Sequence, residues 1–209
     1  MSATTKRQLR GKPPHPTAVA LLDAAVELLE TVPMESLSIA MVLERTGISH
    51  GSLYHHFDDF ADLVEKAVVH RYTRSLKDSL VFIRTLLDGA DREEFRRRVE
   101  AFLHVIVSSE RRKNRLDRIE VLGALQGHPR LVDNIARAQQ DITDEQADIY
   151  REFQRRGWIR SDLDPLAMSA FVQAMIVGRV VDDVSERPVD DDAWRAVALA
   201  AFRTVLFAE

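Results

Sequence analysis

The amino-acid sequence predicts an all-α protein, and three observations support this fold class. Apolar residues recur at intervals of three and four along most of the 209 residues, which is the spacing of an amphipathic helix. A sustained alternation of apolar and polar residues, typical of strands, does not appear. The eight glycines and seven prolines fall mostly between the helical segments. The chain is therefore expected to be a succession of helices.

The first two helices are expected before residue 50. Alanines and leucines at helical spacing predict a helix over 17–31, and Pro33 ends it because proline cannot continue the helical hydrogen bonding. Ser38 can cap a second, shorter helix that runs to Arg45. Gly47 follows it as a residue that readily adopts the left-handed conformation found after helix ends.

Local cues place the remaining helices as well. Ser49 can cap a third helix that ends near Phe57, and Asp59 is placed to begin a long fourth helix to about Leu87. Glycines and prolines then separate the later segments, and Asp164-Pro165 is a typical helix start. The further helices are expected over 92–109, 114–125, 129–156, 164–184 and 191–207.

The composition is that of an ordinary globular protein, and it excludes several kinds of site. There is no cysteine, so disulfides and thiolate metal sites are excluded, and a cytoplasmic location is expected. The basic N-terminus is not followed by an apolar stretch, so a signal peptide is not expected. The longest apolar run, Met168–Val181, is expected to be too short to span a bilayer. Because the net charge is -4, any binding to nucleic acid requires a local patch.

Catalytic and metal-binding patterns are missing from the sequence. It contains no nucleophile elbow, no zinc-protease motif and no phosphate-binding glycine loop. His55 and His56 are adjacent, and neighbouring residues on a helix diverge by about 100°, so they do not form the i,i+4 pair of a helical metal site. We therefore expect no enzyme activity, no cofactor and no metal.

Residues 38–57 have the form of a helix-turn-helix, in which Thr46-Gly47-Ile48-Ser49 connects two short helices. Leu53 and Phe57 lie four residues apart and are expected to pack inward. Gly51 lowers helix stability by about 1 kcal/mol relative to alanine, which favours a close approach by another molecule at this position. Hydroxyl, imidazole and phenol groups suited to phosphates and base edges remain outside, on Ser49, His50, Ser52, Tyr54 and His55.

The segment LSIAMVLERTGISHGSLYHHFDDFADLV resembles the DNA-binding domain of the TetR (tetracycline-repressor) family of bacterial transcriptional regulators. The most specific part is Gly-Ile-Ser-x-Gly-Ser-Leu-Tyr-x-His-Phe at Gly47–Phe57. The resemblance implies a three-helix head whose third helix reads the major groove, and a divergent helical body that binds a small molecule and dimerises. It also implies a repressor that an apolar or amphipathic effector releases from an inverted-repeat operator.

The resemblance assigns roles to individual residues. Ser38 and Ser49 would hold backbone phosphates at helix N-termini, and Tyr54 would lie against the sugar-phosphate backbone. His50, Ser52 and His55 would face bases or phosphates, close to the bare backbone of Gly51, while His56 would support the following turn. The implied domains are a flexible basic tail over 1–16, a DNA-binding domain over 17–75 with its motif at about 38–57, and a ligand-binding and dimerisation domain over 76–209.

The charge of the head leaves a second function open. Between Pro13 and Phe57 the only lysine or arginine is Arg45, against five acidic residues, and Phe60 stands where the family usually has a phosphate-binding lysine. A helical small-molecule sensor or carrier, whose head no longer binds DNA specifically, is therefore the alternative. For DNA binding, the missing positive charge would come from the tail, through Lys6, Arg7, Arg10 and Lys12.

Two sets of residues in the body are candidates for a ligand site. The first is a group of aromatic and apolar side chains with polar neighbours, which line a cavity or belong only to the core: Phe82, Phe102, His104, Asn134, Phe153, Phe171, Gln173 and Met175. The second is the basic run Arg111-Arg112-Lys113 with Arg115 and Arg118, which either attracts an anionic ligand or forms a solvated face.

The last two helices are apolar on more than one side, so each needs two partners. Ala170, Ala174 and Gly178 form a stripe of small residues that permits close helix contact. A second stripe on the final helix comprises Trp194, Ala198, Ala201, Phe202 and Val205. We expect a four-helix interface with a second copy of the chain, as readers of palindromic DNA require, although both helices could instead be central in a monomer.

Overall fold

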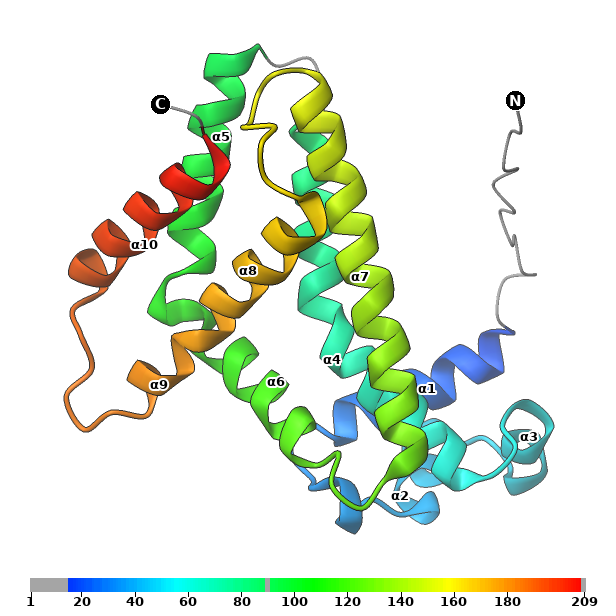
Figure 1. The fold of residues 1–209 in the computed structure, drawn as a ribbon. Coiled ribbons are helices and arrows are strands. Elements are labelled where there is room, and N and C mark those ends of the chain that lie inside the picture. The colour runs from blue at the N-terminus through cyan, green and yellow to red at the C-terminus, as the bar shows by residue number, and fades with distance from the viewer. Residues whose placement is uncertain (1–14, 89–90, 208–209) are drawn as a thin grey trace, which may run out of the picture. The chain divides into compact units, whose positions relative to one another are not determined.

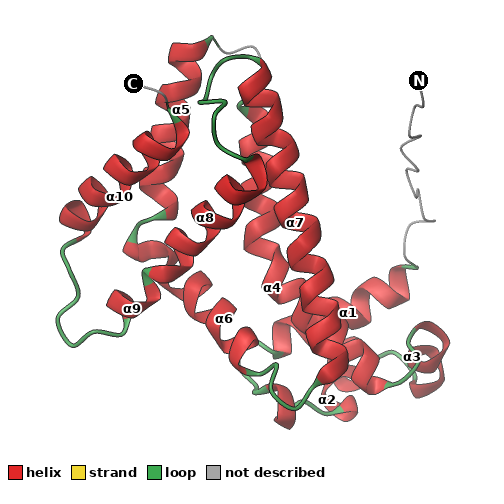
Figure 2. Cartoon of the chain, viewed as in Figure 1, coloured by secondary structure: helices red, strands yellow, loops and turns green. Residues whose placement is uncertain are grey.

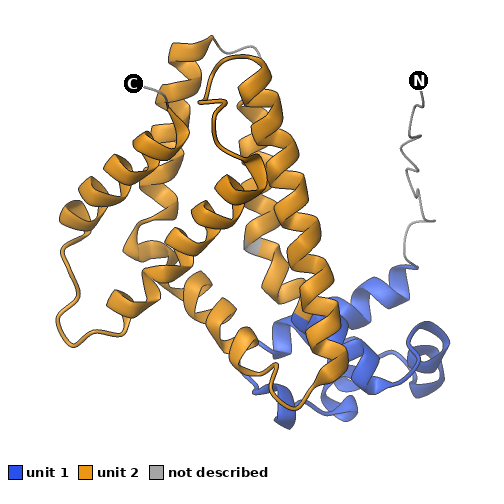
Figure 3. Cartoon of the chain, viewed as in Figure 1, with its two compact units in different colours: residues 1–68 blue, residues 69–209 orange. Residues whose placement is uncertain are grey.

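The computed structural model describes residues 15–88 and 91–207, and within those ranges the chain is helical with no strand (Figures 1 and 2). The all-α fold class is therefore confirmed. The chain separates into two compact units, residues 1–68 and 69–209, which Figure 3 distinguishes by colour. The division falls inside a single long helix, a few residues earlier than the boundary at residue 75 suggested by the resemblance.

The first unit, the head, contains the expected sequence of short helices. They are α1 (Pro16–Leu28), a 3-10 turn η1 (Met34–Ser36), α2 (Ile39–Thr46), α3 (His50–His56) and the start of α4 (Phe60–Thr85). Helices α2, α3 and α4 begin at caps that the sequence indicates: the hydroxyl of Ser38 accepts a hydrogen bond from the Met41 amide, that of Ser49 accepts one from the Ser52 amide, and Asp59 Oδ1 accepts one from the Asp62 amide.

The second unit, the body, comprises the rest of α4 and six further helices among the described residues. They are α5 (Arg92–Ile106), α6 (Arg112–Gly123), α7 (Pro129–Arg155), α8 (Pro165–Gly178), α9 (Val180–Asp183) and α10 (Asp191–Leu206), with a 3-10 turn η2 (Ser109–Arg111) before α6. One expected element differs, because the helix over 164–184 is divided at Arg179. Gly178, a weak helix former, lies at the break.

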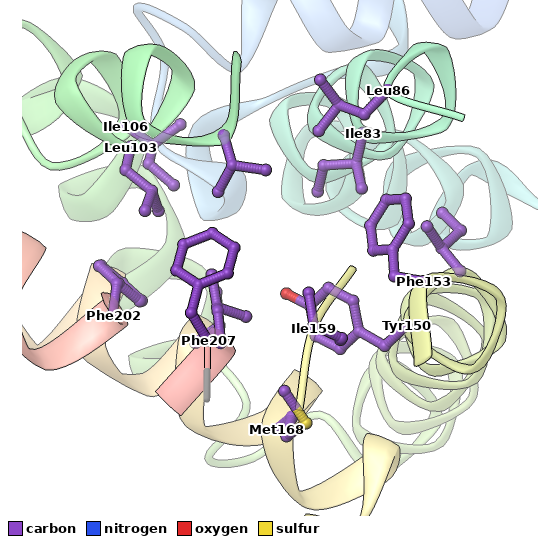
Figure 4. Packing of buried hydrophobic residues seen from close by; sticks show 14 of the residues in the cluster. Ile83, Leu86, Leu103, Ile106, Tyr150, Phe153, Ile159, Met168, Phe202 and Phe207 are labelled. Carbon is purple, nitrogen blue, oxygen red and sulfur yellow. The ribbon is translucent and has the colours of Figure 1, made fainter. Parts of the chain in front are cut away.

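The core of the body is a single cluster of buried apolar side chains drawn from α4, α5, α7, α8 and α10. Figure 4 shows Ile83 of α4, Leu103 of α5 and Phe153 of α7 directed toward this common interior. The ring of Phe95 lies 4.6 Å from that of Phe153 and 4.9 Å from that of Trp158. Such aromatic contacts stabilise the core beyond the burial of area alone.

Candidate DNA-binding surface and ligand cavity

The turn between α2 and α3 is held by its own residues. Gly47 adopts a φ of 67°, in the left-handed region that favours glycine, and its amide donates to the carbonyl of Leu43 at 2.8 Å. The hydroxyl of Thr46 donates to the carbonyl of Val42 at 2.9 Å and accepts from the Ile48 amide at 3.3 Å. These bonds fix the direction in which α3 leaves the turn.

One side of α3 is buried and the other is open to solvent. Leu53 is fully buried and Phe57 nearly so, as their spacing predicts. His50, Tyr54 and His55 are exposed, and the rings of His50 and Tyr54 lie 5.1 Å apart. The helix therefore presents imidazoles and a phenol on the face away from the head's core.

Two hydroxyls and a glycine complete this face. Ser49 accepts a hydrogen bond from the Ser52 amide, and the two hydroxyl oxygens lie 3.0 Å apart. Around Gly51, a Cβ atom would meet nothing within 4 Å. Packing within the described protein therefore does not require glycine there, and the bare backbone remains open to an incoming molecule.

The beginning of α1 lies against α3, which the sequence did not reveal. His15 caps α1 by accepting from the Thr17 amide, and its ring stacks on that of His56 with 4.8 Å between centroids. Desolvation, followed by the neighbouring imidazoles of His15 and His55, lowers the pKa of His56 below its ordinary value of 6.5. His15, where the described chain begins, thus lies beside the last residue of α3.

The two cations of the head that lie among the described residues are paired. Arg45, the only arginine or lysine between Pro13 and Phe57, lies 2.6 Å from Glu27, and Lys66 lies 2.7 Å from Asp62. Because each of these cations is neutralised by a carboxylate, the described part of the head has little net positive charge beside α3. The four cations of the expected tail, Lys6, Arg7, Arg10 and Lys12, lie outside the described residues.

The body contains a partly open cavity of about 100 Å³. Its walls are mostly apolar and include Phe102, Phe153 and, as a polar member, Gln173, three of the eight residues expected at a ligand site. Gln173 belongs to a hydrogen-bonded group in which the Gln146 carbonyl oxygen accepts from both Gln173 and Ser169. This polar group is buried beside the apolar lining.

Tyr150 extends the same group. Its hydroxyl accepts a hydrogen bond from the Gln146 amide at 2.8 Å. Burial raises the pKa of Tyr150 far above its usual value, although the bond from Gln146 acts in the opposite direction. The hydroxyl therefore keeps its proton and remains a donor at the cavity wall.

The other five expected ligand residues do not line this cavity. Phe82 is 40% exposed and stacks on Phe102 from outside at 4.6 Å, while Phe171 is also 40% exposed. His104 is exposed on α5, and Asn134 and Met175 are partly buried but do not belong to the cavity lining. Helical spacing could not separate these positions from true lining residues because both kinds recur with the same period.

The expected dimer residues divide between two environments. Ala170, Ala174 and Gly178 are exposed along α8. Ala198 and Phe202 are buried in the protomer's own core, so they are not available to a partner, and Trp194, Ala201 and Val205 are only partly exposed. The uncovered apolar side of α10 is instead formed by Ala193, Ala196, Val197 and Ala200.

One stretch, Pro165–Asp183, is long and apolar enough to cross a membrane when judged by length and composition alone. It extends the apolar run Met168–Val181 at both ends to span the whole of α8 and α9, so the expectation that this region is too short does not hold by length and composition. Its last turn carries Arg179 and Asp183, whose buried side chains are engaged in ion pairs. A single helix of this kind does not indicate a membrane protein.

Comparison with known proteins agrees with a helix-turn-helix head and an all-helical fold. Residues 21–67 match the sequence model of the family described as bacterial regulatory proteins, tetR family. A search of curated proteins found no match. Many solved structures share the fold.

Three of the similar structures cover nearly the whole chain. One is assigned to the TetR family of transcriptional regulators, from Rhodococcus sp., with 23% identity, 91% of this chain and 98% of that chain covered, and a TM-score of 0.66. Another, assigned to the same family and from Mesorhizobium loti, has 14% identity, coverages of 92% and 97%, and a TM-score of 0.68. A regulator from Saccharomonospora viridis in complex with choline has 18% identity, coverages of 92% and 98%, and a TM-score of 0.63.

Proposed function

We propose that this chain, whose residues 21–67 match the tetR family of bacterial regulatory proteins, is a ligand-responsive transcriptional repressor. In this proposal a homodimer binds an inverted-repeat operator through α3 of each head. A small apolar or amphipathic molecule then binds the body and releases the DNA. The observation that carries the proposal is the outward face of α3, where polar side chains surround an open glycine backbone.

The chemistry of α3 supports major-groove binding. Ser52 and His55 can hydrogen-bond to base edges or phosphates, and each good base contact is worth roughly 1–3 kcal/mol. Ser49, His50 and Tyr54 are exposed at the same helix, and Ser38 lies at the start of α2. The major groove of duplex DNA is wide enough to admit an α-helix such as α3.

The uncovered helix faces support a dimer. On α8 and α9, Phe171 is 40% and Val181 is 77% exposed, and on α10 Val197 is 69% exposed. Exposed apolar residues in continuous stripes mark association surfaces, and a two-fold interface uses the same surface on both copies. A dimer would also present two copies of α3 to the two halves of a palindrome.

Gly51→Ala separates the roles of α3 in folding and in DNA binding. Alanine is the better helix former, so this variant should be as stable as the unmodified protein or up to about 1 kcal/mol more stable. The added methyl should nevertheless obstruct the approach of DNA and lower affinity about tenfold or more. Affinity is measured by fluorescence anisotropy with duplexes from the region upstream of the protein's own gene, and stability by thermal unfolding.

The matched control is Gly123→Ala at the end of α6, another exposed glycine whose Cβ would meet nothing within 4 Å. This variant should leave DNA affinity unchanged. Ser52→Ala and His55→Ala should each weaken specific binding without changing the helical circular dichroism. Unchanged affinity in all three α3 variants would exclude α3 as the reader.

A sensor or carrier without specific DNA binding is the second candidate. The pairing of Arg45 with Glu27 favours it, because the head then offers DNA little free positive charge. This candidate predicts no specific complex with any upstream duplex, whereas a repressor predicts one that competitor DNA does not remove.

A further inference from the structure

The cationic groups of the cavity lining come from one face of α6 and the turn before it. Arg111, Asn114, Arg115 and Arg118 follow one another at helical spacing, and all four line the cavity. Most of the remaining lining is apolar. A molecule in this cavity would therefore meet hydrocarbon on most sides and cationic groups on one side.

Arg115 and Arg118 are both buried, but their charges are balanced differently. Asp183 neutralises Arg115 through two hydrogen bonds of 2.5 and 2.8 Å. Arg118, which is only 8% exposed, has no acidic partner within residues 15–88 and 91–207. Its Nη2 reaches two neutral oxygens, on Tyr72 and Gln139, each at 3.2 Å, and its Nε has no partner there.

The acidic residues nearest to Arg118 in sequence are already engaged. Asp117 accepts from Arg71 and from Lys113, each at 2.8 Å, and Glu120 accepts from Arg71 at 2.9 Å. The guanidinium of Arg118 also lies over the ring of Tyr72 at 5.1 Å, which offsets only part of its desolvation. Burying an arginine without a counter-charge is costly, so an anion beside Arg118 would be strongly favoured.

We propose that the cavity binds a small carboxylate with an apolar body, placing the carboxylate against Arg118 and the body among residues such as Ile83 and Phe153. The size of the cavity limits the body. An apolar protein cavity of about 150 Å³ accommodates benzene, so a space of about 100 Å³ suits an apolar body smaller than benzene, of roughly three to five carbon atoms. This inference rests on the proposed function, since it names the chemical class of the effector.

Isosteric pairs test the charge directly. Butanoate and butanamide have the same shape, as do hexanoate and hexanamide, and only the acids are anionic at pH 7. Isothermal titration calorimetry with the full-length protein should show at least one acid binding ten or more times more tightly than its amide. Arg118→Gln should abolish that preference, while Arg112→Gln, an exposed position on the same helix, should retain it.

The stability of the free protein distinguishes a binding role from a structural one. If Arg118 serves an anion, Arg118→Gln should leave the thermal midpoint of the ligand-free protein unchanged or raise it, because an unbalanced buried charge is removed. A fall in the midpoint, equal binding of acid and amide, no binding of either acid, or a preference retained in Arg118→Gln would each overturn the proposal.

These outcomes are independent of the DNA measurements. Arg118-dependent binding of an acid without any effect on DNA affinity would uphold the site and contradict the ligand-responsive repressor. Specific DNA binding without acid binding would uphold the DNA-binding function and contradict the ligand class.

Discussion

Arg115 on α6 and Asp183 on α9 form a two-pronged ion pair inside the body, with both side chains at most 4% exposed. The third contact of the guanidinium, from Nη1, donates to the carbonyl of Ser108 at 3.0 Å. The two residues are 68 positions apart, so this pair fastens the short helix α9 to the polar side of α6. Removing the carboxylate of Asp183 should therefore lower the free energy of unfolding.

Asp183→Asn should lower the free energy of unfolding by about 3–5 kcal/mol, because it leaves the Arg115 charge buried without a counter-charge. Urea unfolding followed by circular dichroism measures the loss. The double variant Arg115→Met with Asp183→Leu should recover most of it, since apolar residues of similar volume replace the pair. A loss below about 1 kcal/mol in the single variant would mean that water reaches the pair.

Asp191 should contribute a pH-dependent part of the stability. Partial burial would raise its pKa, but hydrogen bonds from the amide and hydroxyl of Ser109 and from Arg179 outweigh this and lower the pKa to about 2. The folded value lies below the unfolded value of 3.8, so the ionised group stabilises the native state above about pH 4. That contribution is lost as the pH falls toward 2.

Asp191→Asn should therefore reduce stability by roughly 1–2 kcal/mol at pH 7, after allowance for solvent screening. The difference from the unmodified protein should close between about pH 4 and pH 2. Asp192→Asn is the control, since this side chain lies in the same turn but is 86% exposed. Equal pH profiles for the two variants would contradict the assignment.

Val197→Glu should dissociate the proposed dimer. Val197 is 69% exposed on α10, and a carboxylate at the centre of an apolar contact would be desolvated without a partner. Sedimentation equilibrium should show the dimer dissociation constant rising at least a hundredfold. Val81→Glu, at a position on α4 that is 65% exposed, should leave the dimer intact. A dimer that survives Val197→Glu must use another surface.

The basic tail should supply the phosphate contacts that the head lacks. Each phosphate neutralised adds about 0.9 to the slope of log affinity against log salt concentration. Replacing Lys6, Arg7, Arg10 and Lys12 with glutamine should flatten this slope and weaken all DNA sequences similarly, because backbone contacts carry little sequence information. Gel-shift titrations from low to high salt measure the slope. An unchanged slope would leave the tail without a role in binding.

Effector and DNA should oppose each other by equal factors. If an acid binds the body and lowers operator affinity tenfold, operator DNA must lower the affinity for that acid tenfold as well. The expected physical cause is a change in the separation of the two recognition helices, which must match half-sites about 34–36 Å apart. Calorimetric titration of the acid into free and DNA-bound protein checks this, and equal affinities would exclude the coupling.

The sequence by itself determined the helices of the head, because capping and turn formation involve residues within four positions of one another. Ser38, Gly47 and Ser49 act through bonds to Met41, Leu43 and Ser52. The same locality made the inward direction of Leu53 and Phe57 predictable from their spacing. Once the buried side of α3 is known, the residues on its other side can be predicted to face outward.

Only the tertiary structure decided which side of each body helix is buried. Phe202 and Val197 belong to one apolar helix, yet Phe202 is fully buried and Val197 is largely exposed, because burial depends on neighbours from distant parts of the chain. In the same way, the sequence could not show which arginines of the basic run 111–118 have carboxylate partners, because the partner of Arg115 lies 68 residues away. Asp183 pairs with Arg115, and the described chain brings no carboxylate to Arg118, so charge balance became visible only after folding.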